Sequence, residues 1–286
     1  MTEKPIHTLL LATDLTSRCD RAARRAVNLA EEWTAQLHVL TVLGVTESVD
    51  DENVSGDVLV AKTRERTEES LGGRGNAVIH VLQGPVDKAI ADLAAEVGAT
   101  LIVTGPSGGR WLGKTPLGST VRSLMRTARV PVLLVKAPVL RKYRRIVVSM
   151  DLSDASRAPV EAAIRLFGRS VSLSIFHAFR TPYRLLSDNI EAYEAGLREG
   201  VTLEIRDALT AWSVADAEDL PIITDHGGAA TKLAELAERH DIDVVVTGTH
   251  GRTGLMSLML GSVAEAIVEA VACDVLVAPS RGAWPD

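Results

Sequence analysis

The sequence predicts an α/β protein built from two tandem domains, each with a parallel sheet that helices cover on both faces. Segments with the apolar pattern of strands alternate with segments of helical pattern, and this order indicates crossover connections between parallel strands. Two strand segments, 101–104 and 244–247, are continuous aliphatic and β-branched runs, which are typical of strands buried on both faces. The same glycine spacing follows both runs, which indicates that the second half of the chain repeats the first.

The elements of the first half follow from this alternation in chain order. An apolar run opens the half and ends at an aspartate, after which a helical pattern begins. The last helical segment starts at the end of the glycine loop, and a short apolar run follows it. The predicted order is strand 7–13, helix 18–34, strand 37–43, helix 58–71, strand 76–82, helix 86–97, strand 99–104, a loop, helix 118–127 and strand 131–136.

Two further matches indicate that the halves are copies of one unit. Thr8–Asp14 matches Arg145–Asp151, and Pro131–Val135 matches Asp274–Ala278. The offset between the copies is 137 residues at the first strand and 143 at the glycine loop, so the second copy carries a net six additional residues. A period of this length has the size of one domain, and it is far too long for a solenoid repeat.

The join between the copies, residues 137–145, contains a proline and four basic residues, which predicts a short exposed linker. The predicted domains are therefore 1–140 and 141–286. The second helix of the second domain is expected to be the longer one. It is predicted at roughly 186–214, with a break near one of its glycines, Gly196 or Gly200.

Composition excludes several classes of function. The chain has 286 residues and a formal net charge of −6, which argues against an unspecific binder of nucleic acid or of anionic membranes. Its cysteines, Cys19 and Cys273, lack the spacing of metal ligands, so we expect two reduced thiols in a cytoplasmic protein. No apolar stretch approaches the roughly 20 residues that span a bilayer, and no membrane partner is expected.

The glycine pattern has the features of a phosphate site. In open parallel sheets, ligands bind beyond the carboxyl ends of the strands, where the strand order reverses. A glycine at that place lets a ligand approach the backbone, and the free N–H groups of a following helix bind anions. The glycines could instead only form turns, but the doubled pattern favours a phosphate site in at least one half. The pattern comprises Gly105, Gly108, Gly118 and Ser119 in the first half, and Gly248, Gly251, Gly261 and Ser262 in the second.

An aspartate, Asp14 or Asp151, ends the first strand of each half at the same edge of the sheet. It could be a polar partner for a ribose or for a metal ion on the phosphates. It could also only cap the turn before the next helix, where Asp is favoured. The glycine loop at the same edge favours the first interpretation.

These residues resemble the motif Gly-x2-Gly-x9-Gly-Ser/Thr that marks the ATP-binding branch of the universal stress protein family, and the resemblance covers nearly the whole chain. The first half departs from the motif, because Ser107 stands where His is usual, Pro106 precedes it and Gly109 is additional. The resemblance implies two Rossmann-like (adenine nucleotide alpha hydrolase-like) domains, each a five-stranded parallel sheet with helices on both faces. It also implies ATP as the ligand, alone or with Mg or Mn.

The resemblance further implies which residues hold the nucleotide. Adenine lies near the ends of the first two strands of each half, and the phosphates meet the glycine loop and the start of the next helix. In the first half these positions are Ala12, Thr13, Asp14, Val42, Thr104, Gly105, Ser107, Gly108, Gly118, Ser119, Thr120 and Val121. In the second half they are Ser149, Met150, Asp151, Ala178, Thr247, Gly248, His250, Gly251, Gly261, Ser262, Val263 and Ala264.

The resemblance also suggests partners. The last strands of the two halves, 131–136 and 274–278, are apolar sheet edges, and such edges aggregate unless they are covered. We therefore expect the halves to pair antiparallel as an internal pseudo-dimer, and two chains to be able to form a homodimer. The function expected is that of a stress regulator in which ATP alters the choice of partner or the oligomeric state.

Two other functions stay open at this point. The segment Gly108–Thr115 also fits the P-loop Gly-x4-Gly-Lys-Thr, which would indicate an NTPase or kinase. Against it, the second half has no Lys-Thr at the matching positions, and Pro116 stands where the P-loop helix should run. The chain could also be an interaction module with empty sites. The apolar segment 255–260 could be an exposed partner surface, or it could pack onto its own domain. Because no catalytic constellation is recognisable, a binding protein is favoured over an enzyme, with slow ATP hydrolysis left open.

Overall fold

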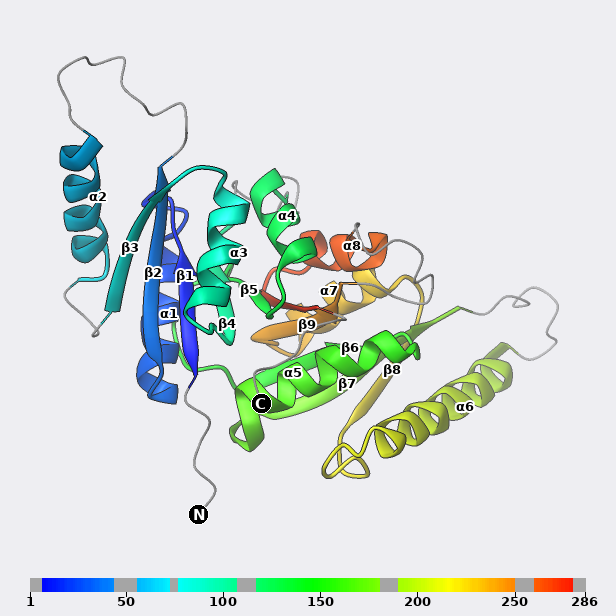
Figure 1. Ribbon diagram of the computed structural model, residues 1–286. Helices are drawn as coiled ribbons and strands as arrows, with labels where there is room; N and C mark the ends of the chain where they lie inside the picture. The colour runs from blue at the N-terminus through cyan, green and yellow to red at the C-terminus, as the bar shows by residue number, and fades with distance from the viewer. Residues whose placement is uncertain are drawn as a thin grey trace. The chain divides into compact units, whose positions relative to one another are not determined.

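The computed structural model describes residues 7–43, 56–72, 77–106, 117–180, 190–249 and 260–279. The chain divides between Lys142 and Tyr143 into two compact units, and each unit is an α/β domain (Figure 1). Among the described residues, no helix has the length and apolar character needed to cross a membrane.

The first unit is a sheet of parallel strands in the order β3-β2-β1-β4-β5. Both faces of its centre are covered, because Leu9, Leu10 and Leu11 point alternately to the two faces and are all fully buried. Each end of each element lies within two residues of its predicted position. The elements are β1 Thr8–Ala12, α1 Asp20–Trp33, β2 Gln36–Leu43, α2 Gly56–Ser70, β3 Ala77–Gln83, α3 Val86–Glu96, β4 Leu101–Thr104, α4 Ser119–Thr127 and β5 Val132–Leu134.

The second unit repeats this topology, with its parallel strands in the order β10-β9-β6-β7-β8. The predicted buried strand is confirmed here, since Val244, Val245 and Val246 are fully buried. The elements are β6 Arg145–Ser149, the short 3-10 turns Asp154–Ser156 and Gly168–Ser170, α5 Arg157–Phe167, β7 Ser172–Phe179, α6 Ile190–Ala211, β8 Ile222–His226, α7 Ala229–Arg239, β9 Val244–Gly248, α8 Ser262–Ala270 and β10 Asp274–Ala278.

The predicted break in the second helix of this unit is wrong, because α6 runs without interruption through Gly196 and Gly200. A glycine inside a helix costs only about 0.5–1 kcal/mol relative to alanine. Ile205 and Leu209 are fully buried, and their packing holds the helix. The helix has 22 residues where α2 has 15, which fits the additional length of the second half.

The topology creates a switch point in each unit. In the first unit the chain passes from β1 to its neighbour β2 and later returns to β4 on the other side of β1. Ala12 at the end of β1 pairs with Thr104 at the end of β4. In the second unit, β6 has the same place between β7 and β9. Ligands of open parallel sheets bind at such points, and predicted residues such as Ala12 and Thr104 lie at this edge.

Candidate functional site

A cavity of about 680 Å³ opens at the carboxyl ends of β6, β7 and β9 in the second unit. The structure brings most of the predicted residues of this half together around it. Met150 is the exception among the described positions, since it is buried at 2% exposure and does not line the cavity. His250 and Gly251 lie outside the described residues. The predicted residues that line the cavity are Ser149, Asp151, Ala178, Thr247, Gly248, Gly261, Ser262, Val263 and Ala264.

The start of α8 forms one wall of this cavity. Gly261 is the N-cap residue with an extended backbone, φ −60° and ψ 140°, and its carbonyl accepts the N–H of Glu265 at 2.9 Å. Within the described part of the chain, no side chain caps this helix. The first N–H groups of an α-helix have no acceptor inside the helix, and the helix dipole adds partial positive charge there. This wall can therefore bind an anion.

A second helix start, that of α7, lines the same cavity with Gly228 and Ala229. Gly227 precedes it with φ +142°, a conformation that side-chain-bearing residues rarely adopt, and this lets the chain turn sharply from β8 into α7. These residues were not predicted from the sequence. A signal existed, because Gly84 at φ +128° has the same place after β3 in the first half.

Asp151 supports the turn between β6 and α5. Its Oδ1 accepts hydrogen bonds from the backbone N–H of Ser153 at 3.1 Å, from the Ser153 hydroxyl at 2.6 Å and from the Ser156 hydroxyl at 2.7 Å. These bonds hold Leu152 at φ +64°, which is strained for a leucine. The turn-forming interpretation of this aspartate therefore applies, and its carboxylate lines the cavity as well.

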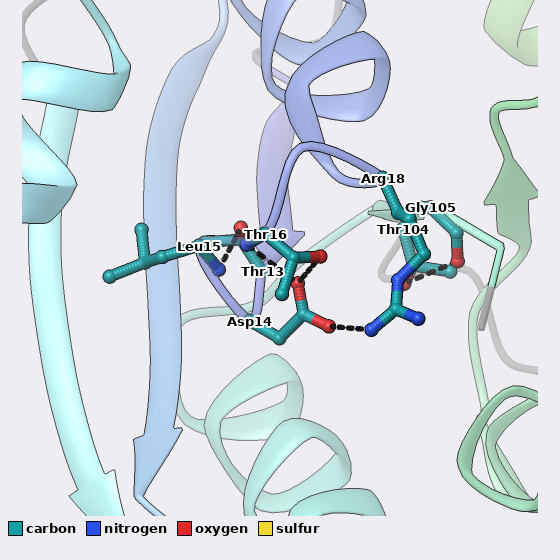
Figure 2. A network of polar contacts seen from close by, with 7 residues as sticks. All are labelled: Thr13, Asp14, Leu15, Thr16, Arg18, Thr104 and Gly105. Atoms are coloured by element: carbon teal, nitrogen blue, oxygen red, sulfur yellow. Dashed lines mark hydrogen bonds and ion pairs between the residues drawn. The ribbon is translucent and has the colours of Figure 1, made fainter. Parts of the chain in front are cut away.

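Asp14 supports the same turn in the first unit (Figure 2). Its Oδ1 accepts the N–H of Thr16 at 2.9 Å and the Thr16 hydroxyl at 2.6 Å, while Leu15 has φ +57°. The Arg18 guanidinium lies 3.7 Å from Asp14 Oδ2. A strained leucine after the strand-end aspartate thus occurs in both halves. This repetition indicates that the turn is part of the site's construction.

The pKa of Asp14 lies below its ordinary value. Burial raises this pKa, but hydrogen bonds from the side chain and backbone of Thr16 and from Cys19, with the charge of Arg18, outweigh it. At pH values above its unfolded-state pKa of about 3.9, Asp14 therefore stabilises the fold. This stabilisation is lost as the pH falls through the lower pKa of the folded state. We expect Asp14→Asn to be less stable than the wild type at pH 6 and to approach it by about pH 3, in urea unfolding across that range.

A second variant tests whether the hydrogen bonds to Asp14 cause this pH dependence. Thr16→Val removes the hydroxyl donor and leaves the carboxylate, so it should reduce the pH dependence without abolishing it. A stability difference between Asp14→Asn and the wild type that stays constant from pH 6 to pH 3 would contradict the proposed role of these hydrogen bonds.

Gly105 has a packing role within the first unit. A Cβ at this residue would lie 3.0 Å from the carbonyl oxygen of Arg18 and 3.2 Å from the Cα and Sγ of Cys19. The glycine therefore lets the end of β4 pack against the start of α1. The backbone of the same unit fills the space of the missing Cβ. That a ligand also approaches the backbone of Gly105 stays a prediction.

The other residues of the first site are partly described. Thr13 and Asp14 follow β1, and Thr104 lies at the end of β4 in contact with Gly105 (Figure 2). Val42 lies near the end of β2. Gly118 is the N-cap of α4, with φ −66° and ψ 160°, and the helix starts with Ser119, Thr120 and Val121. Ser107, Gly108, the P-loop candidate Gly108–Thr115 and the segment 255–259 lie outside the described residues.

Several cavity residues of the second unit were not predicted. His177 is 7% exposed and has its Nδ1 2.8 Å from the Met150 carbonyl oxygen, and it also lines the cavity. Arg180, which follows β7, also lines the cavity. One face of α6 forms a further part of the cavity wall. No sequence signal identifies these helix residues, because the rotation of a helix depends on its packing. The residues from α6 are Leu197, Val201 and Glu204.

Comparison with known proteins matches both halves to one family. The model of the Universal stress protein family matches residues 5–136 and 142–279. Universal stress protein A homolog 1 of Coxiella burnetii is 31% identical over 139 residues, which are 47% of this chain and 94% of the relative. Universal stress protein Rv2005c of Mycobacterium tuberculosis is 27% identical over 193 residues, 63% of this chain and 62% of the relative.

A solved structure extends the likeness to the whole chain. A universal stress protein from Archaeoglobus fulgidus superposes with a TM-score of 0.65 at 18% identity, covering 96% of this chain and 98% of that one. At this identity the likeness shows the fold, which is two Rossmann-like domains in tandem.

Proposed function

Because this chain belongs to the universal stress protein family, with one domain of the family in each half, we propose that it is a regulatory protein that binds adenine nucleotides. The observation that carries the proposal is the cavity of the second unit. It combines a glycine-lined helix start for phosphates with the strand ends of β6 and β7 for the nucleoside. Its volume of about 680 Å³ lies within the range of ligand sites in proteins, roughly 300–1,000 Å³.

The chemistry of the cavity fits a binding role. Among the described residues that line it, the carboxylates are Asp151, whose Oδ1 accepts three hydrogen bonds from its own turn, and Glu204 on α6. Among the described residues, no group of three or more His, Cys, Asp or Glu could hold a metal ion. Mg²⁺ or Mn²⁺ would accordingly arrive with the phosphates of ATP. We propose that ATP occupancy, and not turnover, is the signal.

Calorimetric titration of the purified chain with ATP tests the proposal. We expect saturable binding and turnover slower than about one per second, below the usual range of enzymes. Lys114→Ala should weaken binding only modestly. A complete loss of binding in that variant, with fast hydrolysis in the wild type, would favour the P-loop function. An absence of binding at millimolar ATP would favour the third function, an interaction module with empty sites.

We also propose how the two halves, and two copies of the chain, associate. Tandem domains of one family make an internal pair of the two halves possible, through the apolar strands β5 and β10. We propose this internal pair and a further homodimer of the chain. The mass and the radius of gyration of the chain in solution, with and without ATP, test both.

A further inference from the structure

One face of α6 lies on the cavity of the second unit. Leu197, Val201 and Glu204 line the cavity, and their spacing of i, i+4 and i+7 places them on one side of an α-helix. Ile205 and Leu209 are fully buried, so packing fixes the rotation of the helix. Glu204 itself is exposed, and its carboxylate is available to a bound molecule.

The cavity has two chemically different sides, which lie on either side of β6. On the β9 side, the start of α8 offers N–H donors and the positive end of a helix dipole. On the β7 side, Ala178, Leu197 and Val201 are apolar lining residues, Glu204 adds a negative charge, and Arg180 after the end of β7 adds a positive one. A carboxylate accepts hydrogen bonds and cannot donate them, so the group that it contacts must be a donor.

We propose that Glu204 selects a nucleotide whose base carries an exocyclic amino group and orients that base toward α6. The inference rests on the proposed nucleotide site. The amino group donates to the carboxylate while the flat base covers Leu197 and Val201. The free N–H groups at the start of α8 attract the phosphates, and the Glu204 carboxylate disfavours a phosphate beside itself, so the phosphates are expected at α8. Glu204 is thus a specificity residue, and the main-chain groups at α8 supply the affinity for the phosphates.

The first half offers a contrast on the equivalent helix. Thr63 and Thr67 of α2 are buried four residues apart, as Ile205 and Leu209 are in α6. This correspondence puts Lys62 where the second half has Glu204. An ammonium group cannot accept a hydrogen bond from an amino group. The selection should therefore be a property of the second site alone.

The test compares ATP with purine riboside 5′-triphosphate, which is ATP without the 6-amino group. In titrations of the full chain, we expect the second site to bind ATP about tenfold more tightly, as one hydrogen bond to a charged group provides. Glu204→Leu should bind the two equally. Glu204→Gln should keep part of the preference, because its amide oxygen still accepts. Glu199→Leu, which removes a charge from the same helix away from the cavity, should keep all of it.

The outcomes separate this inference from the proposed function. If the wild type binds both triphosphates equally, or if Glu204→Leu still prefers ATP, Glu204 does not select the base. The proposed nucleotide site would be unaffected by that result. If neither triphosphate binds, the proposed function fails and this inference fails with it. GTP also carries an exocyclic amine, so tighter binding of GTP than of purine riboside triphosphate, lost in Glu204→Leu, would support the selection.

Discussion

Gly261→Asp should abolish ATP binding at the second site without unfolding the protein. Gly261 has a negative φ, so its backbone conformation is open to any residue. Asp is among the best N-cap residues, and its carboxylate would accept the N–H groups at the start of α8. These are the groups proposed to bind the phosphates. The new charge both occupies them and repels the nucleotide, and we expect a loss of affinity of about 100-fold or more.

The same change in the first half makes a matched experiment. Gly118 is the N-cap of α4 with nearly the same backbone conformation, φ −66° and ψ 160°. Calorimetric titration of Gly118→Asp, Gly261→Asp and the double variant would report which half holds ATP. Thermal unfolding serves as the control, since an added N-cap should leave the Tm unchanged or slightly higher. Undiminished binding in the double variant, with both helices intact, would rule out the helix starts as the phosphate sites.

The fold could be predicted from the sequence because its signals are local and occur twice. Alternation of apolar runs placed the ends of each first-half element within two residues, and the doubled glycine spacing identified the edge of the sheet where the cavity opens. The wall from α6 could not be predicted in this way. Whether Glu204 points into a cavity depends on the rotation of the helix, which the burial of Ile205 and Leu209 decides.

Gly105 and Asp14 show a second limit of sequence patterns. A glycine at a strand end is compatible with close approach of a ligand and with close approach of another part of the chain, and the spacing alone does not distinguish them. In the structure, the start of α1 occupies the space beside Gly105. Likewise, Asp14 was expected to meet either a ligand or its own turn. Its hydrogen bonds with Thr16 show the role in the turn, and contact with a ligand stays a prediction.

Gly105→Ala should destabilise the first unit even when no nucleotide is present. The added Cβ would lie 3.0–3.2 Å from backbone atoms of Arg18 and Cys19, and backbone cannot move aside as the end of a flexible side chain can. Overpacking of this kind costs about 1–3 kcal/mol. Since 1 kcal/mol shifts the Tm of domains of roughly this size by about 2–8 °C, calorimetric unfolding of the nucleotide-free protein should resolve the change.

The control for Gly105→Ala is the same substitution at Gly196. A Cβ there meets nothing within 4 Å, and the residue lies inside α6, so alanine should stabilise the helix by about 0.5–1 kcal/mol. Two identical changes are thus expected to act in opposite directions. If Gly105→Ala left the nucleotide-free Tm unchanged and only weakened ATP binding, the glycine would serve the ligand after all. A lower Tm of the empty protein would instead show that Gly105 lets α1 start against the end of β4.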